Sequence, residues 1–367
     1  MLRILHCVNI MDRAGLETML MNYYRNIDRS IVQFDFLTHR SEKGAYDNEI
    51  KKMGGRIFHA PRLYPKNYIS YFAFMKLFFQ EHPEYKIVHS HIDTMSAFPL
   101  FAAKKSHVPI RIGHCHSSKL DIDVKLPIKY LAKLLLPFEA NVYAACGKKA
   151  AKFMFGNRPT KILHNAIEIG QFEFNQNIRN AIRNSLGLSD NFVIGHVGRY
   201  YYVKNQSFLI DIFKIVKQIV PNAFLLLVGK GEDEQKLKRK VSLLNLENSV
   251  DFLVDRDDVN ELYQAMDVFV MPSLFEGLPL VGVEAQANGL PCLFSDSISD
   301  EILLTNNAEK MSLNRSPSEW ANKIVSMKRS EMLQKNNYRL IEEGFDISRE
   351  VTELTSWYFY LLKEIQV

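Results

Sequence analysis

The sequence has little cysteine and no long hydrophobic run, and its first residues do not have the pattern expected of a secretory leader. No stretch reaches the roughly eighteen apolar residues that a membrane-spanning helix requires, so none is predicted. Residues 1–8 form a short apolar segment that polar residues follow at once, which is unlike a signal peptide. The cysteines are far apart and form no CxxC pair, which excludes a disulfide framework and a cysteine-based zinc site. We therefore expect a cytoplasmic protein with reduced, buried thiols. The four cysteines are Cys7, Cys115, Cys146 and Cys292.

A strong charge of either sign is also missing. The formal net charge is +5, a mildly basic balance that suits an anionic ligand or an anionic membrane surface and is too weak to indicate nucleic-acid binding. The composition, 47% hydrophobic and 24% charged, is that of a folded globular protein. At 367 residues the chain is long for one hydrophobic core, so we expect two domains.

Short apolar runs alternate with segments of helical spacing along nearly the whole chain. This order predicts an α/β fold whose mostly parallel sheets are covered by helices on both faces. A polar, asparagine-rich stretch at 164–191 interrupts the pattern, which then restarts. We therefore predict two Rossmann-like domains, 1–170 and 171–345, facing each other across a cleft at the carboxyl ends of their strands, and a C-terminal helix at 346–367. The strands are expected at 3–8, 33–38, 56–59, 86–89, 110–113, 141–145, 161–163, 192–197, 224–228, 250–253, 268–271 and 292–294.

The segment 267–296 carries the most informative pattern. A buried strand is followed by a tight turn at 276–279, a helix at 280–288 and a second strand. The free N–H groups at the start of this helix lie at the positive end of its dipole, which suits a phosphate. Glu276 and Glu284 bracket the turn, and each carboxylate can bind sugar hydroxyls. The alternative is an ordinary helix with one acid in a loop and the other on a solvated face.

Two basic residues, Arg199 and Lys204, follow the strand expected at 192–197. Parallel sheets bind ligands at such strand ends, where arginine can clamp a phosphate bidentately and lysine adds a point charge. The alternative is a solvated loop. Gly231 and Arg256 follow the next two strands and are weaker candidates, because glycine lets a backbone approach a nucleotide and Arg256 could border a base.

In the first half of the chain, candidate residues again follow strands. Gly15 opens the first long helix, where the backbone can close on a ligand. Two H-x-H pairs follow two other strands, and their imidazoles can bond to sugar hydroxyls. A zinc site built from the four histidines of these pairs is the minor alternative, because no cysteine or carboxylate completes a known zinc spacing; no metal site is therefore predicted. The pairs are His89 with His91 and His114 with His116.

A basic amphipathic helix is expected at Asp123–Pro137. Lys125, Lys129 and Lys133 are spaced four residues apart among leucines and a tyrosine. Such a helix can lie on an anionic membrane. The ordinary alternative is a helix that covers the sheet and keeps its lysines in solvent.

Six segments, in this order, resemble family 4 retaining glycosyltransferases of the GT-B fold. They are AGLE, HSH, HCHSS, VGRYYYVKN, VGKGEDE and PSLFEGLPLVGVEAQANGLP, and they span most of the chain. The last of them is the most specific. The chain is most similar to bacterial exopolysaccharide and capsule enzymes of the EpsF type. The family commonly has two glycines where this chain has Ala14-Gly15.

The resemblance implies a role for each matching residue of the second domain. Glu276 would face the donor sugar and Glu284 the nucleotide ribose, while Arg199 and Lys204 would hold the donor diphosphate. The backbone after Glu276 would bind the phosphates. The implied nucleotide-sugar site is completed by Gly15, Gly231, Arg256, Gly277, Leu278 and Pro279.

In the first domain, the resemblance implies that His116 contacts the donor sugar, with His114 as the alternative if the alignment shifts by two. Gly15 would lie near the diphosphate and the acceptor. This domain would bind the acceptor, the second would bind the nucleotide sugar, and the C-terminal helix would pack back toward the first.

The resemblance thus implies transfer of a hexose or N-acetylhexosamine from a nucleotide-diphosphate sugar, UDP being favoured, to a hydroxyl of a glycan or lipid-linked glycan. No metal or other cofactor is expected, because the cations would stabilise the leaving diphosphate. The enzyme would be cytoplasmic and peripheral on the inner face of the cell membrane.

Three other functions remain open from the sequence. A retaining glycosidase would use Glu276 and Glu284 as acid and nucleophile, but it leaves Arg199 and Lys204 without a role. A UDP-sugar 2-epimerase shares the two-domain scaffold. A non-catalytic nucleotide-sugar-binding subunit of a polysaccharide complex would keep both cations and show no turnover.

Overall fold

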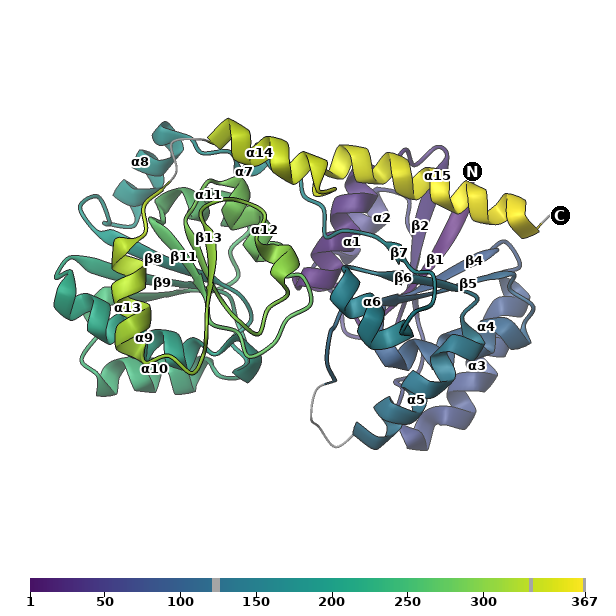
Figure 1. Ribbon diagram of the computed structural model, residues 1–367. Coiled ribbons are helices and arrows are strands. Elements are labelled where there is room, and N and C mark those ends of the chain that lie inside the picture. The colour runs from purple at the N-terminus through teal and green to yellow at the C-terminus, as the bar shows by residue number, and fades with distance from the viewer. Residues whose placement is uncertain (121–125, 330–332, 366–367) are drawn as a thin grey trace. The chain divides into compact units, whose positions relative to one another are not determined.

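The computed structural model describes residues 1–120, 126–329 and 333–365. It divides the chain into two compact units, one formed by Met1–Ala166 with Ile347–Val367 and the other by Ile167–Asp346. Each unit is a parallel sheet with helices on both faces (Figure 1). The predicted α/β fold with two Rossmann-like domains is confirmed.

The first unit is built on a seven-stranded sheet in the order β3-β2-β1-β4-β5-β6-β7. The strand order reverses between β1 and β4, which makes this the switch point where doubly wound sheets bind ligands. Strands β1, β2, β4 and β5 are almost entirely buried, as expected for parallel strands covered on both faces. The strands are β1 (Leu2–Val8), β2 (Val32–Thr38), β3 (Ile57–His59), β4 (Ile87–Ser90), β5 (Ile110–Cys115), β6 (Val142–Ala145) and β7 (Lys161–Ile162).

Helices from both ends of the chain cover this sheet. The C-terminal helix α15 (Ile347–Ile365) places Val351, Leu354 and Tyr358 in the same core as β1 and β2. The Tyr23 hydroxyl of α1 (Gly15–Asn26) donates to a Glu350 carboxylate oxygen at 3.4 Å. The other helices are α2 (Asp47–Lys52), α3 (Tyr68–Glu81), α4 (Ala97–Lys105), α5 (Leu126–Glu139) and α6 (Lys148–Phe155), with the short helices η1 (Pro65–Asn67) and η2 (Asp93–Ser96).

The second unit repeats this plan with a six-stranded sheet in the order β10-β9-β8-β11-β12-β13. Its order reverses between β8 and β11, so the strand ends of this pair form the second switch point. The strands are β8 (Phe192–Val197), β9 (Ala223–Val228), β10 (Val250–Leu253), β11 (Val268–Met271), β12 (Cys292–Ser295) and β13 (Ala308–Met311).

The helices of the second unit bury an apolar face against the sheet. Helices α9 and α13 meet around the fully buried Trp320, which belongs to the same core cluster as β8, β9 and β11. The helices are α7 (Ile169–Phe172), α8 (Gln176–Ser185), α9 (Gln206–Ile219), α10 (Glu234–Leu243), α11 (Val259–Ala265), α12 (Leu280–Ala287), α13 (Pro317–Ser326) and α14 (Leu333–Glu342), with the short helices η3 (Tyr202–Lys204), η4 (Glu247–Ser249) and η5 (Asp300–Ile302).

The expected strands agree with the observed ones to within one or two residues, and the structure adds β13 and helices α7 and α14. All four cysteines are buried, and no disulfide joins any of them within the described residues. Within the part of the chain that the structure describes, no helix has both the length and the apolar character needed to cross a bilayer.

Candidate active site

The loops after β8 and β11 bring two of the predicted charged residues together. The Lys204 ammonium nitrogen lies 2.7 Å from Glu276 Oε1, and these side chains are only 20% and 16% exposed. The loops are also joined through their backbones, because the Leu274 N–H donates to the Val203 carbonyl at 2.8 Å. An acid and a cation thus lie side by side at the switch point of the second sheet, where a ligand is expected.

A residue in the left-handed backbone conformation stabilises this arrangement of the two loops. Asn205, between η3 and α9, has φ +56°, a conformation that asparagine tolerates better than most residues. Its side-chain amide donates to the Pro272 carbonyl at the end of β11, at 3.1 Å. Gln206 donates to the Arg199 carbonyl at 2.9 Å, which fixes the start of the same loop. Of these two consecutive residues, Asn205 therefore has a structural role, and Lys204 is the one available for chemistry.

Arg199 does not join the Lys204–Glu276 pair. Its guanidinium lies 2.7 Å from Glu232, and the two side chains are 64% and 53% exposed. It also lies 5.3 Å from the centre of the Tyr201 ring. Such exposed ion pairs contribute about 1 kcal/mol or less, so an anionic ligand can displace Glu232 at little cost.

Gly231 is required by packing. A Cβ atom built there would lie 2.2 Å from the Tyr200 carbonyl oxygen, since the loops after β8 and β9 run against each other. Gly229 has φ +147° and would meet the Gly198 carbonyl in the same way. Arg256 pairs with Asp258 two residues away, through Nε and Oδ1 at 2.7 Å.

The turn before α12 has the expected form. Pro279 is extended and immediately precedes the helix, Leu278 and Pro279 are buried, and Gly277 is partly exposed. Gly289, with φ +75°, follows the last turn and ends the helix in the left-handed conformation that glycine adopts without strain. The first-turn amides of α12 and the partly exposed Glu276 therefore lie on one short segment.

Glu284 lies one turn into α12 and is buried, at 7% exposure. One of its carboxylate oxygens accepts a hydrogen bond from the Tyr263 hydroxyl at 2.8 Å. Burial raises the pKa of Glu284 to about 7, and the bond from Tyr263 opposes this shift. The side chain therefore titrates near neutral pH and can both accept and donate hydrogen bonds. Tyr263, in α11, has no motif around it and was missed in the sequence.

In the first unit, Gly15 begins α1 in open surroundings. A Cβ atom at this glycine would have no described heavy atom within 4 Å, so packing alone does not require glycine here. Ala14, which precedes it, offers no side chain to cap the first N–H groups of the helix. Glu17 in the same turn is buried, and burial raises its pKa to about 7. This helix start can receive an anionic or hydroxyl-bearing ligand.

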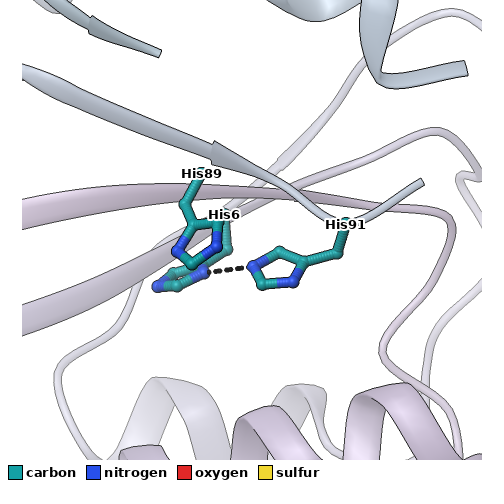
Figure 2. Close-up of side chains that lie close together, drawn as sticks. All are labelled: His6, His89 and His91. Carbon is teal, nitrogen blue, oxygen red and sulfur yellow. Dashed lines mark hydrogen bonds between the residues drawn. The ribbon is translucent and has the colours of Figure 1, made fainter. Parts of the chain in front are cut away.

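The two H-x-H pairs meet at the switch point of the first sheet. His91 Nδ1 lies 3.1 Å from His116 Nε2, and His89 Nε2 lies 3.1 Å from His114 Nδ1. The structure adds a fifth imidazole, that of His6, which was not predicted because it lies within an apolar strand. Figure 2 shows His6, His89 and His91 gathered closely, with His6 Nδ1 hydrogen-bonded to His91 Nε2 at 2.9 Å.

His116 is the only partly exposed member among these five imidazoles. Its backbone N–H donates to Asp93 Oδ1 at 2.8 Å, and the Ser117 hydroxyl lies 3.3 Å from the other oxygen. Burial lowers the pKa of His116 to about 3, so the ring is neutral at physiological pH. A neutral ring at a strand end can bond to a sugar hydroxyl.

Comparison with known proteins identifies the family. The profile described as "Glycosyl transferases group 1" matches residues 178–344. The putative glycosyltransferase EpsF of Bacillus subtilis is 34% identical over 97% of this chain and 96% of its own length. The UDP-Gal:alpha-D-GlcNAc-diphosphoundecaprenol alpha-1,3-galactosyltransferase of Escherichia coli is 28% identical over 75% of each chain.

A solved structure confirms the fold. Anabaena HepE in complex with UDP and glucose aligns with a TM-score of 0.79 at 20% identity, covering 98% of this chain and 99% of HepE. This alignment includes both units. The comparisons give no support to the epimerase alternative. The chain has the GT-B fold and belongs to the group 1 glycosyltransferases, of the family 4 type.

Proposed function

We propose that this glycosyltransferase moves a hexose or N-acetylhexosamine from a UDP-sugar to a hydroxyl of a lipid-linked glycan in exopolysaccharide or capsule biosynthesis, with retention and without a metal. The observation that carries the proposal is the Lys204–Glu276 pair beside the start of α12, at the switch point of the second sheet. Cation, acid and helix amides together match a sugar diphosphate.

The donor and acceptor classes are supported by the relatives. HepE has been solved with UDP and glucose, and the Escherichia coli relative is named for a UDP-galactose donor and a lipid-diphosphate-linked acceptor. Glu284, buried and titrating near neutral pH, suits the ribose hydroxyls, because it can accept from one hydroxyl while Tyr263 bonds to its other side.

In the proposed reaction, the bond between the anomeric carbon and the β-phosphate oxygen breaks. The acceptor oxygen bonds to that carbon from the same face, and its proton passes to the departing diphosphate. Lys204 offsets the charge that develops on the diphosphate. Arg199 adds to this once it leaves its exposed pair with Glu232. These cations do what a metal does in other enzymes, so no metal is needed in this scheme.

In the first unit, the proposal assigns the neutral His116 to the donor sugar and the open start of α1 at Gly15 to the diphosphate and acceptor. The orientation of His116 is supported by its contacts with His91 and Asp93. Glu276 would bind a donor-sugar hydroxyl once Lys204 turns to the diphosphate.

The test uses purified protein, a panel of UDP- and GDP-sugars and an isolated lipid-linked acceptor, with EDTA present. We expect acceptor-dependent release of UDP and one sugar added per UDP released. Release of free sugar by water alone would instead indicate a glycosidase. Tight UDP-sugar binding without turnover would indicate a non-catalytic subunit. Loss of transfer in EDTA that only a metal restores would refute the metal-independent scheme.

We further propose that the enzyme acts at the cytoplasmic face of the membrane and docks through α5. Asp123 and Lys125 lie outside the described residues, but Lys129 and Lys133 lie on α5. Only two side chains of α5, Ala132 and Leu136, are buried. The exposed apolar residues are Tyr130, Leu131, Leu134, Leu135 and Phe138, which are 44–70% exposed. A contiguous apolar surface beside lysines is typical of an interfacial helix.

The helices packed next to α5 also carry exposed apolar side chains. Helix α4 packs on α5 and α3 packs on α4. Phe101 of α4 is 37% exposed and has the Lys105 ammonium 5.7 Å from its ring centre. In α3, Ile69 and Leu77 are 91% and 58% exposed. The ordinary alternative, in which the apolar face of α5 covers the sheet, leaves these side chains in water.

Replacing Lys125, Lys129 and Lys133 by glutamate tests the docking proposal. Each lysine near an anionic surface contributes about 1 kcal/mol, so the triple change should weaken binding to phosphatidylglycerol vesicles by about 100-fold or more. Leu134→Ser with Phe138→Ser should weaken binding to neutral vesicles as well. The matched control is Lys214→Glu with Lys236→Glu, two exposed lysines of the second unit. Unchanged vesicle binding in both α5 variants would rule out this helix.

A further inference from the structure

Five histidines at the carboxyl edge of the first sheet form one packed cluster, which we call the histidine cluster. Strand register explains it, since His6 pairs with His89 across β1 and β4 and alternate residues of a strand share a face. The closest ring centres are those of His114 with His116, at 4.1 Å, and His89 with His91, at 4.2 Å. The cluster consists of His6, His89, His91, His114 and His116.

The imidazoles bond to one another in two chains. One runs from His6 Nδ1 to His91 Nε2 and from His91 Nδ1 to His116 Nε2, at 2.9 and 3.1 Å. The other runs from the Tyr358 hydroxyl to His89 Nδ1 and from His89 Nε2 to His114 Nδ1, at 2.8 and 3.1 Å. Each chain ends on a buried nitrogen without a hydrogen-bond partner among the described residues, His6 Nε2 or His114 Nε2. Buried polar atoms without partners are rare and call for a ligand, an ion or water.

Two overlapping sets of three histidines have metal-ligand geometry. In each set, one ring nitrogen from every residue lies within 4.8 Å of those from the other two. The inner set, His6, His89 and His91, is entirely buried, whereas the outer set, His91, His114 and His116, contains the partly exposed His116. A metal ion must reach its ligands from solvent, and of these two sets only the outer one has a partly exposed member.

We propose that His91, His114 and His116 bind a divalent transition-metal ion, with Zn²⁺ as the first choice. The ligand atoms are His91 Nδ1, His116 Nε2 and the unpartnered His114 Nε2. A tetrahedral zinc with bonds of 2.0–2.1 Å separates its nitrogens by about 3.3 Å. His91 Nδ1 and His116 Nε2 are already 3.1 Å apart. Three imidazoles and an open fourth position on the His116 side suit zinc, and nickel, copper and cobalt are the competitors.

The surroundings of the outer set fit this role. When His91 Nδ1 binds a metal, its Nε2–H can donate to His6 Nδ1. When His114 Nε2 binds, its Nδ1–H can donate to His89 Nε2, and His89 Nδ1–H can donate to the Tyr358 oxygen. One set of tautomers thus satisfies every one of these bonds, as in metal sites whose ligand histidines are held by outer partners.

The metal site does not depend on the proposed function, but its consequence does. His116 is the residue that we assign to the donor sugar, so a bound ion would compete with the donor and inhibit transfer. The metal is therefore a regulator at most, and the transfer reaction itself still needs none. Sequence spacing did not predict the site because it depends on two H-x-H pairs being brought side by side by the sheet.

The test is a Co²⁺ titration of the full chain after EDTA treatment, followed by visible absorption. We expect one Co²⁺ with a tetrahedral spectrum, displaced by one equivalent of Zn²⁺. His114→Gln and His116→Gln should each weaken Co²⁺ binding by more than tenfold, and His6→Gln, an outer partner, by about tenfold. His82→Gln, on a partly exposed histidine of the same unit, should change nothing.

Three results would overturn the proposal: no tetrahedral spectrum in the wild-type protein, wild-type affinity in His116→Gln, or equal losses in the His82→Gln control. His116→Gln is the decisive variant, because this partly exposed ring can be changed with least harm to folding, which thermal unfolding checks. If the protein gives a full Co²⁺ spectrum but transfers no sugar when it is assayed free of metal in EDTA, the proposed function is refuted and the metal site stands. Unchanged transfer at saturating Zn²⁺ would refute the inhibitory consequence.

Discussion

Replacing Lys204 by methionine removes an ammonium group from the second switch point and keeps most of the side chain. This ammonium lies 2.7 Å from Glu276 Oε1 in a site where both side chains are less than one quarter exposed. Hydrogen bonds to charged groups contribute about 1.5–3 kcal/mol under such conditions. If Lys204 binds the diphosphate, its loss should weaken UDP binding by about 10- to 160-fold. Transfer should fall by about 100- to 1000-fold, as when an enzyme loses one donor to a developing anion.

Isothermal titration with UDP and a steady-state transfer assay measure these two effects. The effect on folding should be small, about 1 kcal/mol, because water still reaches Glu276 after the change. The matched control is Lys238→Met, which breaks an exposed 2.7 Å pair with Glu234 on α10 and should leave both readouts unchanged.

Glu276→Gln provides the opposite test at the same pair. In the structure Glu276 holds Lys204, so removing its charge frees the ammonium for the diphosphate. UDP binding should then tighten or stay the same while transfer falls, because the proposed contact to the donor sugar is lost. If Lys204→Met binds UDP within about twofold of wild type, a difference below about 0.5 kcal/mol, then Lys204 does not hold the diphosphate.

Three further predictions concern the residues around this site. Burial raises the pKa of Glu284 from 4.5 to about 7, so the wild-type protein should lose about 3 kcal/mol of unfolding free energy between about pH 4.5 and pH 7, where the unfolded chain has already released the proton. Glu284→Gln should abolish this part of the pH dependence, and urea unfolding of both proteins at about pH 5 and pH 8 checks it; parallel curves would contradict the assignment. Tyr263→Phe removes the hydroxyl 2.8 Å from Glu284 and should cost about 1–3 kcal/mol at pH 8, and less at pH 5, where the carboxyl is protonated. Gly231→Ala places a methyl group 2.2 Å from the Tyr200 carbonyl and should destabilise the fold by about 1–3 kcal/mol, whereas Gly170→Ala, with no described heavy atom within 4 Å, should cost less than about 1 kcal/mol; equal thermal shifts would show that the two loops do not need their close approach.

Much of the fold could be predicted because the buried strands are continuous apolar runs. Strands such as Phe192–Val197 and Val268–Met271 need no partner information to be recognised. Strand β13 was missed because its sequence, Ala-Glu-Lys-Met, is short and half polar, as befits an edge strand. Helix α7 was missed because four residues are too few to show a helical period.

The candidate site was predictable where chemistry and turn residues coincide along the chain, as at 276–279. The pairing of Lys204 with Glu276 depends on β8 and β11 being neighbours, which no local pattern shows. Tyr263 and His6 were missed for the same reason. Each is an aromatic or imidazole ring in an apolar segment, and only the packing of distant segments gives it a polar partner. The partner of Arg199 could not be predicted either, because no pattern along the chain indicates which acid an exposed loop cation will meet, and the structure pairs it with Glu232.

The decisive experiment is a crystal structure of the protein with UDP. We expect the diphosphate within hydrogen-bond distance of the Lys204 ammonium and the backbone N–H groups of Gly277, Leu278 and Leu280, the ribose on Glu284, and Lys204 drawn away from Glu276. UDP bound elsewhere, or bound at this sheet with Lys204 still paired to Glu276 and no phosphate on the α12 amides, would contradict it.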